Sequence, residues 1–290
     1  MIFIRTCSER ATSHVIIRPD VPGDNVQRSG WEKWHDWNAV VFAAMTRWFC
    51  DASGAAPRQT ILDAACGTGL PSLALAERVH PSGKVVAIDS SPVMLAAAMR
   101  IARSAGVSNI EHRPMDVTAL GFPDAAFDAV TCKDGLMFCA DPIKAATELR
   151  RVLKPNGRFA MSAWDEPEKN AFFMTIHQVV SQFIPRQAPR AGAPGPFRLA
   201  PAAEFESVLH QAGFSELTTQ SMEVVFEVES TDVHWHIVSD MSAPVEQAKA
   251  TLSVADVQRM KHAMADALEP YRAGHRIRLP NTALCISGRR

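Results

Sequence analysis

The residues with the clearest chemical meaning are two glycines in a short turn and an aspartate that follows them. Residues 61–70 read ILDAACGTGL, so Gly67 and Gly69 stand between an expected buried strand and an expected helix. A Cβ atom at either position would collide with a ligand lying against the backbone turn. Asp89 ends a second apolar segment, at residues 85–89. In nucleotide-binding α/β folds, an acidic residue at this place holds the two hydroxyls of a ribose.

The glycine turn lacks one feature of a dinucleotide site. A dinucleotide-binding turn has a third glycine that packs the helix against the strand below a pyrophosphate. Here that position is Ser72. Its identity argues against NAD, although a reductase remains an alternative on the turn alone.

Strands and helices alternate over the first half of the chain. Apolar runs of five or six residues alternate with segments of helical periodicity, which predicts a parallel sheet covered by helices on both faces. Right-handed crossovers then give a doubly wound, Rossmann-like α/β fold. The expected strands are residues 60–65, 84–89, 109–115, 127–132 and 157–164, and the expected helices are residues 71–79, 92–105 and 141–153.

The flanking segments differ in character from this core. We expect a loose arm at residues 1–28, helices at 31–50, 168–183 and 201–212, a proline-rich loop at 184–201, strands at 216–229 and 283–288, and a mostly helical insertion at 231–280. The fold class is therefore α/β, a doubly wound, seven-stranded, mostly parallel sheet with helical additions forming a substrate lid. We divide the chain into an arm and lid helix (1–56), a ligand-binding core (57–165), a cap segment (166–215) and C-terminal strands with their insertion (216–290).

Further motifs follow in a fixed order. Met115-Asp116-Val117 comes after the third strand, FDAV at residues 127–130 opens the fourth, and LRRVLKPNGRF at residues 149–159 leads into the fifth. Together with the glycine turn and Asp89, these motifs make residues 57–165 resemble the class I S-adenosylmethionine-dependent methyltransferases. The resemblance is greatest to the small-molecule branch that includes the ubiquinone and menaquinone biosynthesis methyltransferases.

The resemblance implies a cofactor, S-adenosylmethionine, with S-adenosylhomocysteine as product, and a role for individual residues. The turn backbone would lie beside the methionine moiety, Asp89 would accept the ribose hydroxyls, and Asp116 would hold the adenine amine. Cys132 and Lys133 would face the cofactor from the end of the fourth strand. The residues expected to bind the cofactor are Ala65, Gly67, Thr68, Gly69, Asp89, Ser90, Met94, Asp116, Val117, Cys132 and Lys133.

The acceptor site must come from the segments outside the core. Methyl transfer from a sulfonium needs positioning and desolvation more than a fixed catalytic residue. Candidate bases are His35, His177, His234 and His236. Candidate substrate-binding residues, chosen because aromatic walls suit planar or apolar molecules, are Trp31, Trp34, Met137, Trp164, Phe173 and Trp235. Each aromatic residue is also consistent with ordinary core packing.

These observations favour an enzyme that methylates a small, planar or apolar metabolite. The motifs of enzymes that methylate the amines of nucleic-acid bases or arginine are missing. A protein that binds S-adenosylmethionine or S-adenosylhomocysteine without catalysis is the alternative. The sequence indicates no metal ligand set, and the acceptor atom is left open.

Composition limits the partners and the cellular compartment that we expect for this chain. The 290 residues carry 30 Lys and Arg against 31 Asp and Glu, a net charge of -1, which predicts no general affinity for nucleic acid or anionic membranes. We find no signal peptide and no run long enough to span a membrane, and expect a cytoplasmic monomer or homodimer. Most of the cysteines lie in apolar surroundings and none has metal-binding spacing, which predicts reduced thiols: Cys7, Cys50, Cys66, Cys132, Cys139 and Cys285.

Overall fold

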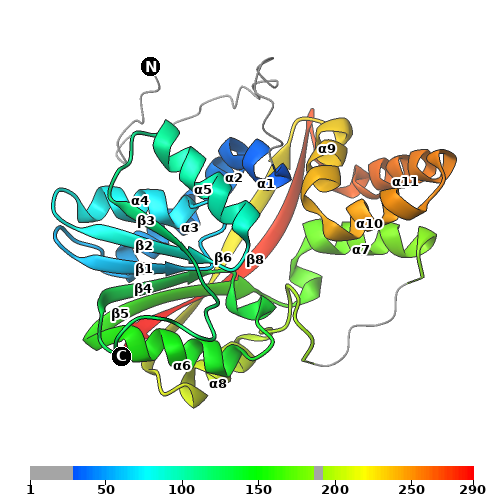
Figure 1. Cartoon of the computed structure of the whole chain (residues 1–290). Helices are drawn as coiled ribbons and strands as arrows, with labels where there is room; N and C mark the ends of the chain where they lie inside the picture. Colours follow the sequence, from blue (N-terminus) through cyan, green and yellow to red (C-terminus); the bar gives the residue numbers. More distant parts are fainter. Residues whose placement is uncertain (1–28, 186–191) are drawn as a thin grey trace.

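The computed structural model describes residues 29–185 and 192–290. The arm expected at residues 1–28 lies outside these ranges. One sheet forms the centre, with strand order β3-β2-β1-β4-β5-β8-β6 (Figure 1). The first five of these strands are parallel, and β8 is antiparallel to both β5 and β6. The strands are β1 (Thr60–Ala64), β2 (Lys84–Asp89), β3 (Ile110–Pro114), β4 (Phe127–Lys133), β5 (Leu153–Trp164), β6 (Ser215–Val228), β7 (Arg272–Ala273) and β8 (Arg276–Arg289).

The predicted α/β class, with a doubly wound and mostly parallel sheet, is confirmed. Helices cover both faces of the sheet, with α3, α4 and α5 on one side and α6 and α8 on the other (Figure 1). The central strands β1 and β2 are almost entirely buried, as expected for parallel strands between two helical layers. Seven strands form the continuous path that was predicted, and the two-residue β7 pairs with β8 beside it. The core helices are α4 (Leu70–Val79), α5 (Pro92–Ser104), α6 (Pro142–Val152) and α8 (Ala202–Gln211).

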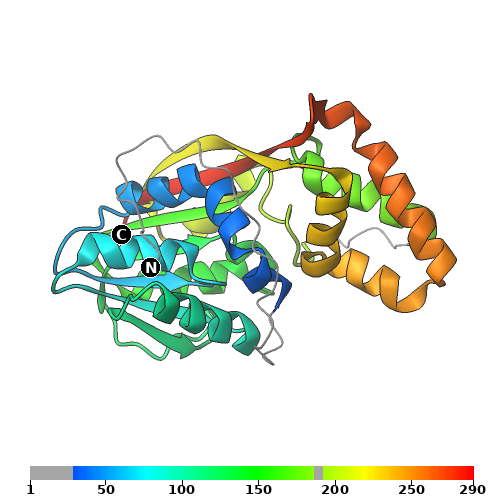
Figure 2. The same ribbon diagram turned by 90° about the horizontal axis from the view of Figure 1, so that it is seen from above.

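A helical cap stands beyond the ends of β6 and β8 (Figures 1 and 2). Its helices contact one another, and α7 also contacts β8. They are α7 (Ala171–Phe183), α9 (Thr231–Met241), α10 (Ala243–Thr251) and α11 (Val254–Ala267). Short 3-10 turns occur at η1 (Leu136–Phe138), η2 (Pro167–Lys169) and η3 (Glu269–Tyr271). The cap corresponds to the helical insertion predicted between the last two strands, together with the predicted helix at 168–183.

The single helix predicted at residues 31–50 is wrong. The segment forms three short helices, α1 (Gly30–Lys33), α2 (His35–Val41) and α3 (Ala43–Ala52). They are separated at Trp34 and Phe42, whose ψ angles are 17° and 12°. The i to i−4 hydrogen bonds continue through both breaks, from Asn38 N–H to Trp34 C=O and from Thr46 N–H to Phe42 C=O. The apolar residues therefore keep the spacing of a helix across the segment, although the helix is interrupted at two residues.

The last strand begins at Arg276 rather than at Ala283. Proline breaks a strand only where its missing N–H is needed. Pro280 lies opposite Val225 of β6, and the pairing of β8 with β5 starts only at Ala283. One edge of β8 is therefore unpaired at Pro280, and the strand continues through it.

No helix within the described ranges combines the length and the apolar character needed to cross a membrane.

Candidate cofactor and acceptor site

The glycine turn lies at the carboxyl edge of the sheet, where chain order reverses between β1 and β4. Ligands of open α/β sheets bind at such a switch point. Ala65, Gly67 and Gly69 have φ angles of 52°, 55° and 87°, all left-handed. The turn is held by Cys66, whose N–H donates to Ile88 C=O of β2 at 2.9 Å. A Cβ atom added to Gly67 would meet no heavy atom within 4 Å, so the turn faces open space where a ligand can lie against its backbone.

Asp89 is tied directly to this turn. Its Oδ2 accepts the N–H of Gly67 at 2.9 Å and its Oδ1 accepts the N–H of Ser91 at 2.8 Å. A carboxylate has about four acceptor positions, so two remain for the hydroxyls of a ribose. Asp89 thus has a structural role in holding the turn that the sequence did not indicate, and it keeps the capacity for the predicted one.

A buried carboxylate lies beneath the turn. Asp63 is fully buried and accepts hydrogen bonds from Ser72 Oγ at 2.5 Å and Thr131 Oγ1 at 2.8 Å. Ser72 occupies the place of the missing third glycine, so its hydroxyl links the first turn of α4 to β1. Burial raises the pKa of Asp63 to about 6, because the charged form loses its hydration.

We predict that the stability of Asp63→Asn relative to wild type increases by about 2–3 kcal/mol between pH 4 and pH 8. This is the free energy equivalent of a two-unit pKa shift. The pKa of Asp63 in the folded protein lies above its unfolded value of 3.8, so the native state binds more protons than the unfolded state at pH values between the two. The stability of the wild type therefore falls as pH rises through about 6. The asparagine can accept from Ser72 and donate to Thr131, whose hydroxyl is 3.4 Å from Leu62 C=O. Urea unfolding of both proteins from pH 4 to 8 measures this, and a constant difference across that range would contradict it.

The loop after β3 carries the residues expected beside adenine. Asp116 is exposed, and its Oδ1 accepts both the N–H and the hydroxyl of Thr118, at 2.8 and 2.9 Å. These bonds lower the pKa of Asp116, the one from the backbone N–H most. Its other oxygen has no hydrogen-bond partner among the described residues and can accept from an amine. Ser90 is exposed and Met94 and Val117 are half-buried, as a ligand-facing surface requires.

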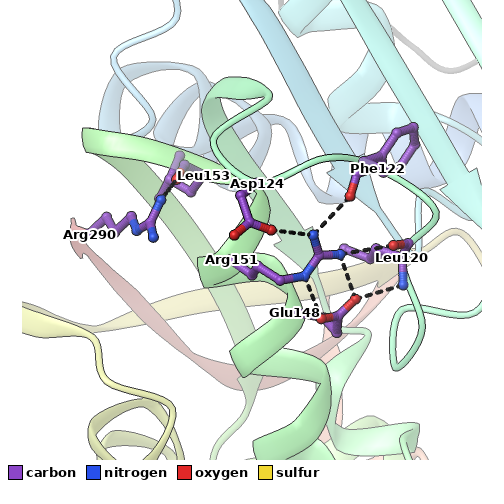
Figure 3. Close-up of polar contacts among 7 residues, drawn as sticks. All are labelled: Leu120, Phe122, Asp124, Glu148, Arg151, Leu153 and Arg290. Atoms are coloured by element: carbon purple, nitrogen blue, oxygen red, sulfur yellow. Dashed lines mark hydrogen bonds and ion pairs between the residues drawn. The ribbon is translucent and has the colours of Figure 1, made fainter.

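Arg151 holds the same loop from behind (Figure 3). Its guanidinium donates to the carbonyls of Leu120 and Phe122 at 2.9 and 2.8 Å and to Asp124 at 2.8 Å. It also pairs with Glu148 through two bonds of 2.7 and 2.8 Å, and Glu148 in turn accepts the N–H of Leu120 at 2.9 Å. The motif at 149–159 therefore contributes a residue that positions the loop. Sequence reasoning missed that role.

We predict that Arg151→Met weakens S-adenosylhomocysteine binding about threefold to tenfold and lowers the melting temperature. The methionine keeps the alkyl stem but loses two donors to loop carbonyls, each worth about 1 kcal/mol or more, so the loop carrying Asp116 becomes less ordered. Titration calorimetry and thermal unfolding measure the two effects. Arg103→Met, a change on α5 at an exposed arginine, is the matched control and should alter neither.

An ion pair lies at the end of β4. Lys133 Nζ is 2.7 Å from Asp134 Oδ2, and the two side chains are only 16% and 12% exposed. Asp134 has a left-handed φ of 52° and accepts from Ser162 Oγ at 2.6 Å. The Lys133 ammonium also lies 3.8 Å from the ring centre of Phe42. Cys132 is buried, and burial places the pKa of its thiol well above its usual value, so it is not a nucleophile at neutral pH.

The structure separates the predicted acceptor residues into two groups. Trp164 and Phe173 lie together, 5.0 Å between ring centres, in a cluster that also holds Phe42 and Phe226. Met137 is buried within the same core. Trp34 is buried in the same core but is in the second group, which makes no ring contact with this cluster among the described residues; its indole N–H donates to Asp240 of α9 at 2.8 Å. Trp31 is 39% exposed and Trp235 is 9% exposed, and among the described residues neither makes a ring contact with the cluster.

The four candidate histidines lie in different places. His35 is near the glycine turn, with Nδ1 3.4 Å from Thr68 Oγ1, and burial lowers its pKa. His177 and His236 are exposed on α7 and α9. His234 is fully buried in the cap. The structure therefore brings only His35 to the cofactor turn.

The cysteines within the described ranges are all free thiols, as predicted; Cys7 lies outside those ranges. No three His, Cys, Asp or Glu side chains in residues 29–185 and 192–290 are grouped so that they could hold a metal ion.

Known proteins resemble this chain in sequence. Residues 61–157 match the methyltransferase domain family. A demethylmenaquinone methyltransferase of Thermus thermophilus is 42% identical over 130 residues, 45% of this chain and 58% of that protein. The Escherichia coli ubiquinone/menaquinone biosynthesis C-methyltransferase UbiE is 38% identical over 122 residues, 42% of this chain and 49% of that one. The chain thus spans about half the length of the curated relatives it matches.

Solved structures share the fold. The YcgJ protein of Bacillus subtilis has a TM-score of 0.55 at 18% identity, covering 87% of this chain and 98% of that one. Phosphoethanolamine N-methyltransferase 2 of Haemonchus contortus, in complex with S-adenosyl-L-methionine, has a TM-score of 0.54 at 18% identity, covering 88% and 56%. The sequence matches over the core confirm the predicted resemblance to class I S-adenosylmethionine-dependent methyltransferases.

Proposed function

We propose that this protein transfers a methyl group from S-adenosylmethionine to a small, planar or apolar acceptor. The observation that carries the proposal is the left-handed turn at Gly67, open to a ligand on one side and bonded to Asp89 on the other. This turn lies inside the segment that matches the methyltransferase domain.

The residues around the turn fit the cofactor. The open space at Gly67 suits the methionine moiety, and Asp89 has two unused acceptor positions for the ribose. The free oxygen of Asp116 suits the adenine amine, with Ser90, Met94 and Val117 at its sides. Thr68 and Gly69 complete the turn. When bound, the cofactor supplies an electrophilic methyl group on a sulfonium.

The chain itself supplies position and shielding. Lys133 lies at the end of β4 and is neutralised by Asp134, so this pair adds no net positive charge beside a sulfonium. The aromatic cluster of Phe42, Trp164 and Phe226 is apolar and buried, which would exclude water from the acceptor. His35 would be the nearest candidate for moving a proton, because burial lowers its pKa, which favours the neutral imidazole, and because it lies against the turn.

A lid is part of this proposal. The segment 31–50 and the loop 184–201, of which residues 186–191 lie outside the described ranges, should close over the bound cofactor. His35 already touches the turn, and Gly195 N–H donates to Met137 C=O at 3.0 Å. Trp34 and Trp37 are anchored to Asp240 and to Glu227 C=O, so movement would involve side chains and helix ends more than the whole segment.

We predict that S-adenosylhomocysteine slows amide hydrogen exchange in both 31–50 and 184–201. The physical reason is that a sulfonium site must be shielded from water, and these segments border the open edge of the sheet. Exchange measured by mass spectrometry with and without the ligand tests this. Unchanged exchange in both segments would show that another part of the chain covers the site.

Turnover tests the proposed activity. The purified chain is incubated with methyl-labelled S-adenosylmethionine and a small-molecule extract of bacterial cells, and label is followed into low-mass products together with S-adenosylhomocysteine. Transfer is the expected result. Binding of S-adenosylhomocysteine without transfer would favour the alternative, a binding protein that lacks catalysis.

We also propose that the protein is a cytoplasmic monomer or homodimer and that it does not bind nucleic acid. Size-exclusion chromatography with light scattering measures the assembly, and an electrophoretic shift assay with duplex DNA and RNA tests the last point.

A further inference from the structure

Two arginines lie opposite each other on neighbouring strands of the sheet. Arg158 of β5 and Arg289 of β8 are direct partners in the antiparallel register, so their side chains share one face, and like charges in such a pair are destabilising. Among the described residues, each guanidinium donates only to a backbone carbonyl, Arg158 to Ala52 at 3.0 Å and Arg289 to Asn156 at 3.2 Å. The pair therefore carries two positive charges with no carboxylate partner in the part of the chain that the structure describes.

Two hydroxyl groups lie beside the arginines on the same face. Ser287 comes two positions before Arg289 on β8, and Thr218 of β6 is its direct partner. Side chains two positions apart on a strand share a face, as do those of direct partners. The face thus combines two cations with two hydroxyl donors from three neighbouring strands.

An open cavity of about 190 Å³ lies among these side chains. One water needs only about 10–15 Å³ of such space, so the cavity has room for a small polyatomic ion. Glu216 is the only carboxylate on its lining among the described residues, and it forms no ion pair with either arginine there. The lining residues are Arg158, Glu216, Thr218, Ser287, Gly288 and Arg289.

These donors suit a phosphate group. A guanidinium has five N–H donors and forms paired, charge-assisted hydrogen bonds with phosphate oxygens. A phosphate dianion would balance both arginines, whereas a carboxylate carries half of that charge. Because the cavity is small and no lysine among the described residues lines it, a single phosphate group fits it better than an extended polyanion does.

The cavity is separate from the cofactor turn. Arg158 pairs with Ala129 near the amino end of β4, whereas Lys133, at the carboxyl end, pairs with Ser162. Figure 1 shows that β8 ends at the marked C-terminus, on the side of the sheet away from the helical cap. A ligand of this cavity would therefore not contact the residues that we assign to the cofactor.

We propose that the cavity between Arg158 and Arg289 binds a phosphate group, either as the free ion or on a small soluble molecule. The inference does not depend on the proposed methyl transfer. It assigns a second ligand site to the chain, built by β5, β6 and β8 at the amino edge of the parallel strands.

Calorimetric titration of the full chain with inorganic phosphate, at pH 8 and constant ionic strength, tests the site. Arg289→Met keeps the alkyl stem and should bind at least about tenfold more weakly than wild type, the worth of one charge-assisted hydrogen bond. Glu216→Gln should bind more tightly, because it removes a negative charge from the lining. Arg103→Met, the exposed arginine of α5, is the matched control and should bind like wild type.

Thermal unfolding separates binding from a structural role of the arginines. In chloride buffer, Arg289→Met should melt at the same or a higher temperature than wild type, because the repulsion with Arg158 is lost. Phosphate stabilises proteins in general, so the informative quantity is the difference between variants. It should raise the melting temperature of wild type more than that of Arg289→Met. Equal increases in both proteins, or a wild type that does not bind phosphate, would overturn the inference.

Ethyl phosphate and vesicles that contain phosphatidic acid distinguish the sources of the phosphate group. Equal affinities for ethyl phosphate and inorganic phosphate would support a site for the free ion. Tighter binding of the ester would support a site for a phosphate carried by a small molecule. Binding to the vesicles without binding of either soluble probe would overturn the inference.

Discussion

Asp89→Ala is expected to weaken S-adenosylhomocysteine binding at least a hundredfold. Hydrogen bonds to a carboxylate are worth about 1.5–3 kcal/mol each, and two ribose hydroxyls would make two of them. The substitution also removes the acceptor of the Gly67 N–H, so the turn loses a hydrogen bond that holds its conformation in the free protein. The two losses act in the same direction on affinity, whereas a purely structural carboxylate would act only through the turn.

Titration calorimetry with three variants separates these contributions. Asp89→Asn keeps one oxygen for the turn and should bind with intermediate affinity. Asp51→Ala removes an exposed carboxylate that pairs with Arg78, and should bind like wild type. An Asp89→Ala protein with wild-type affinity would show that the ribose is held elsewhere.

The sequence predicted those parts of the site that depend on local pattern. A turn with Gly67 and Gly69 needs left-handed backbone angles, and the structure has them. Asp89 could be placed because strand ends of a parallel sheet share one edge. The alternation of strands and helices was sufficient for the sheet, since each crossover has one favoured hand.

Contacts between distant residues could not be predicted in this way. Arg151 donates to the carbonyls of Leu120 and Phe122 because the loop after β3 lies beside α6 in the folded chain. Trp34 was predicted to bind substrate, yet its indole N–H donates to Asp240, 206 positions away. The indole N–H of Trp37 likewise donates to Glu227 C=O, 190 positions away. Such partners depend on how distant segments pack in three dimensions, and periodicity carries no information about that packing.

Left-handed residues other than glycine were also missed. Asp134 has a φ of 52°, stabilised by its bonds to Lys133 and Ser162. Aspartate tolerates this region better than most residues, and Asp134 lies just beyond the end of β4, but the sequence does not show that Lys133 and Ser162 would hold it there. The ion pair at the end of β4 was therefore visible only in three dimensions.

Gly67→Val is expected to abolish detectable S-adenosylhomocysteine binding while leaving the fold intact. The added side chain enters open space, since no heavy atom lies within 4 Å of the Cβ position, so the protein itself does not resist it sterically. A bound methionine moiety would occupy that space. The remaining cost is the left-handed φ of 55°, which a branched residue adopts at an expense of about 1–2 kcal/mol.

Gly106→Val is the matched control, because it separates the backbone cost from the effect on the ligand. Gly106 follows α5, two residues after Ser104, with a φ of 71°, and its Cβ position also has no neighbour within 4 Å. Both variants should therefore lose a similar amount of stability in thermal unfolding, and their circular dichroism should match wild type. Only Gly67→Val should lose binding in calorimetry. Equal affinities in the two variants would mean that the cofactor does not lie against the turn.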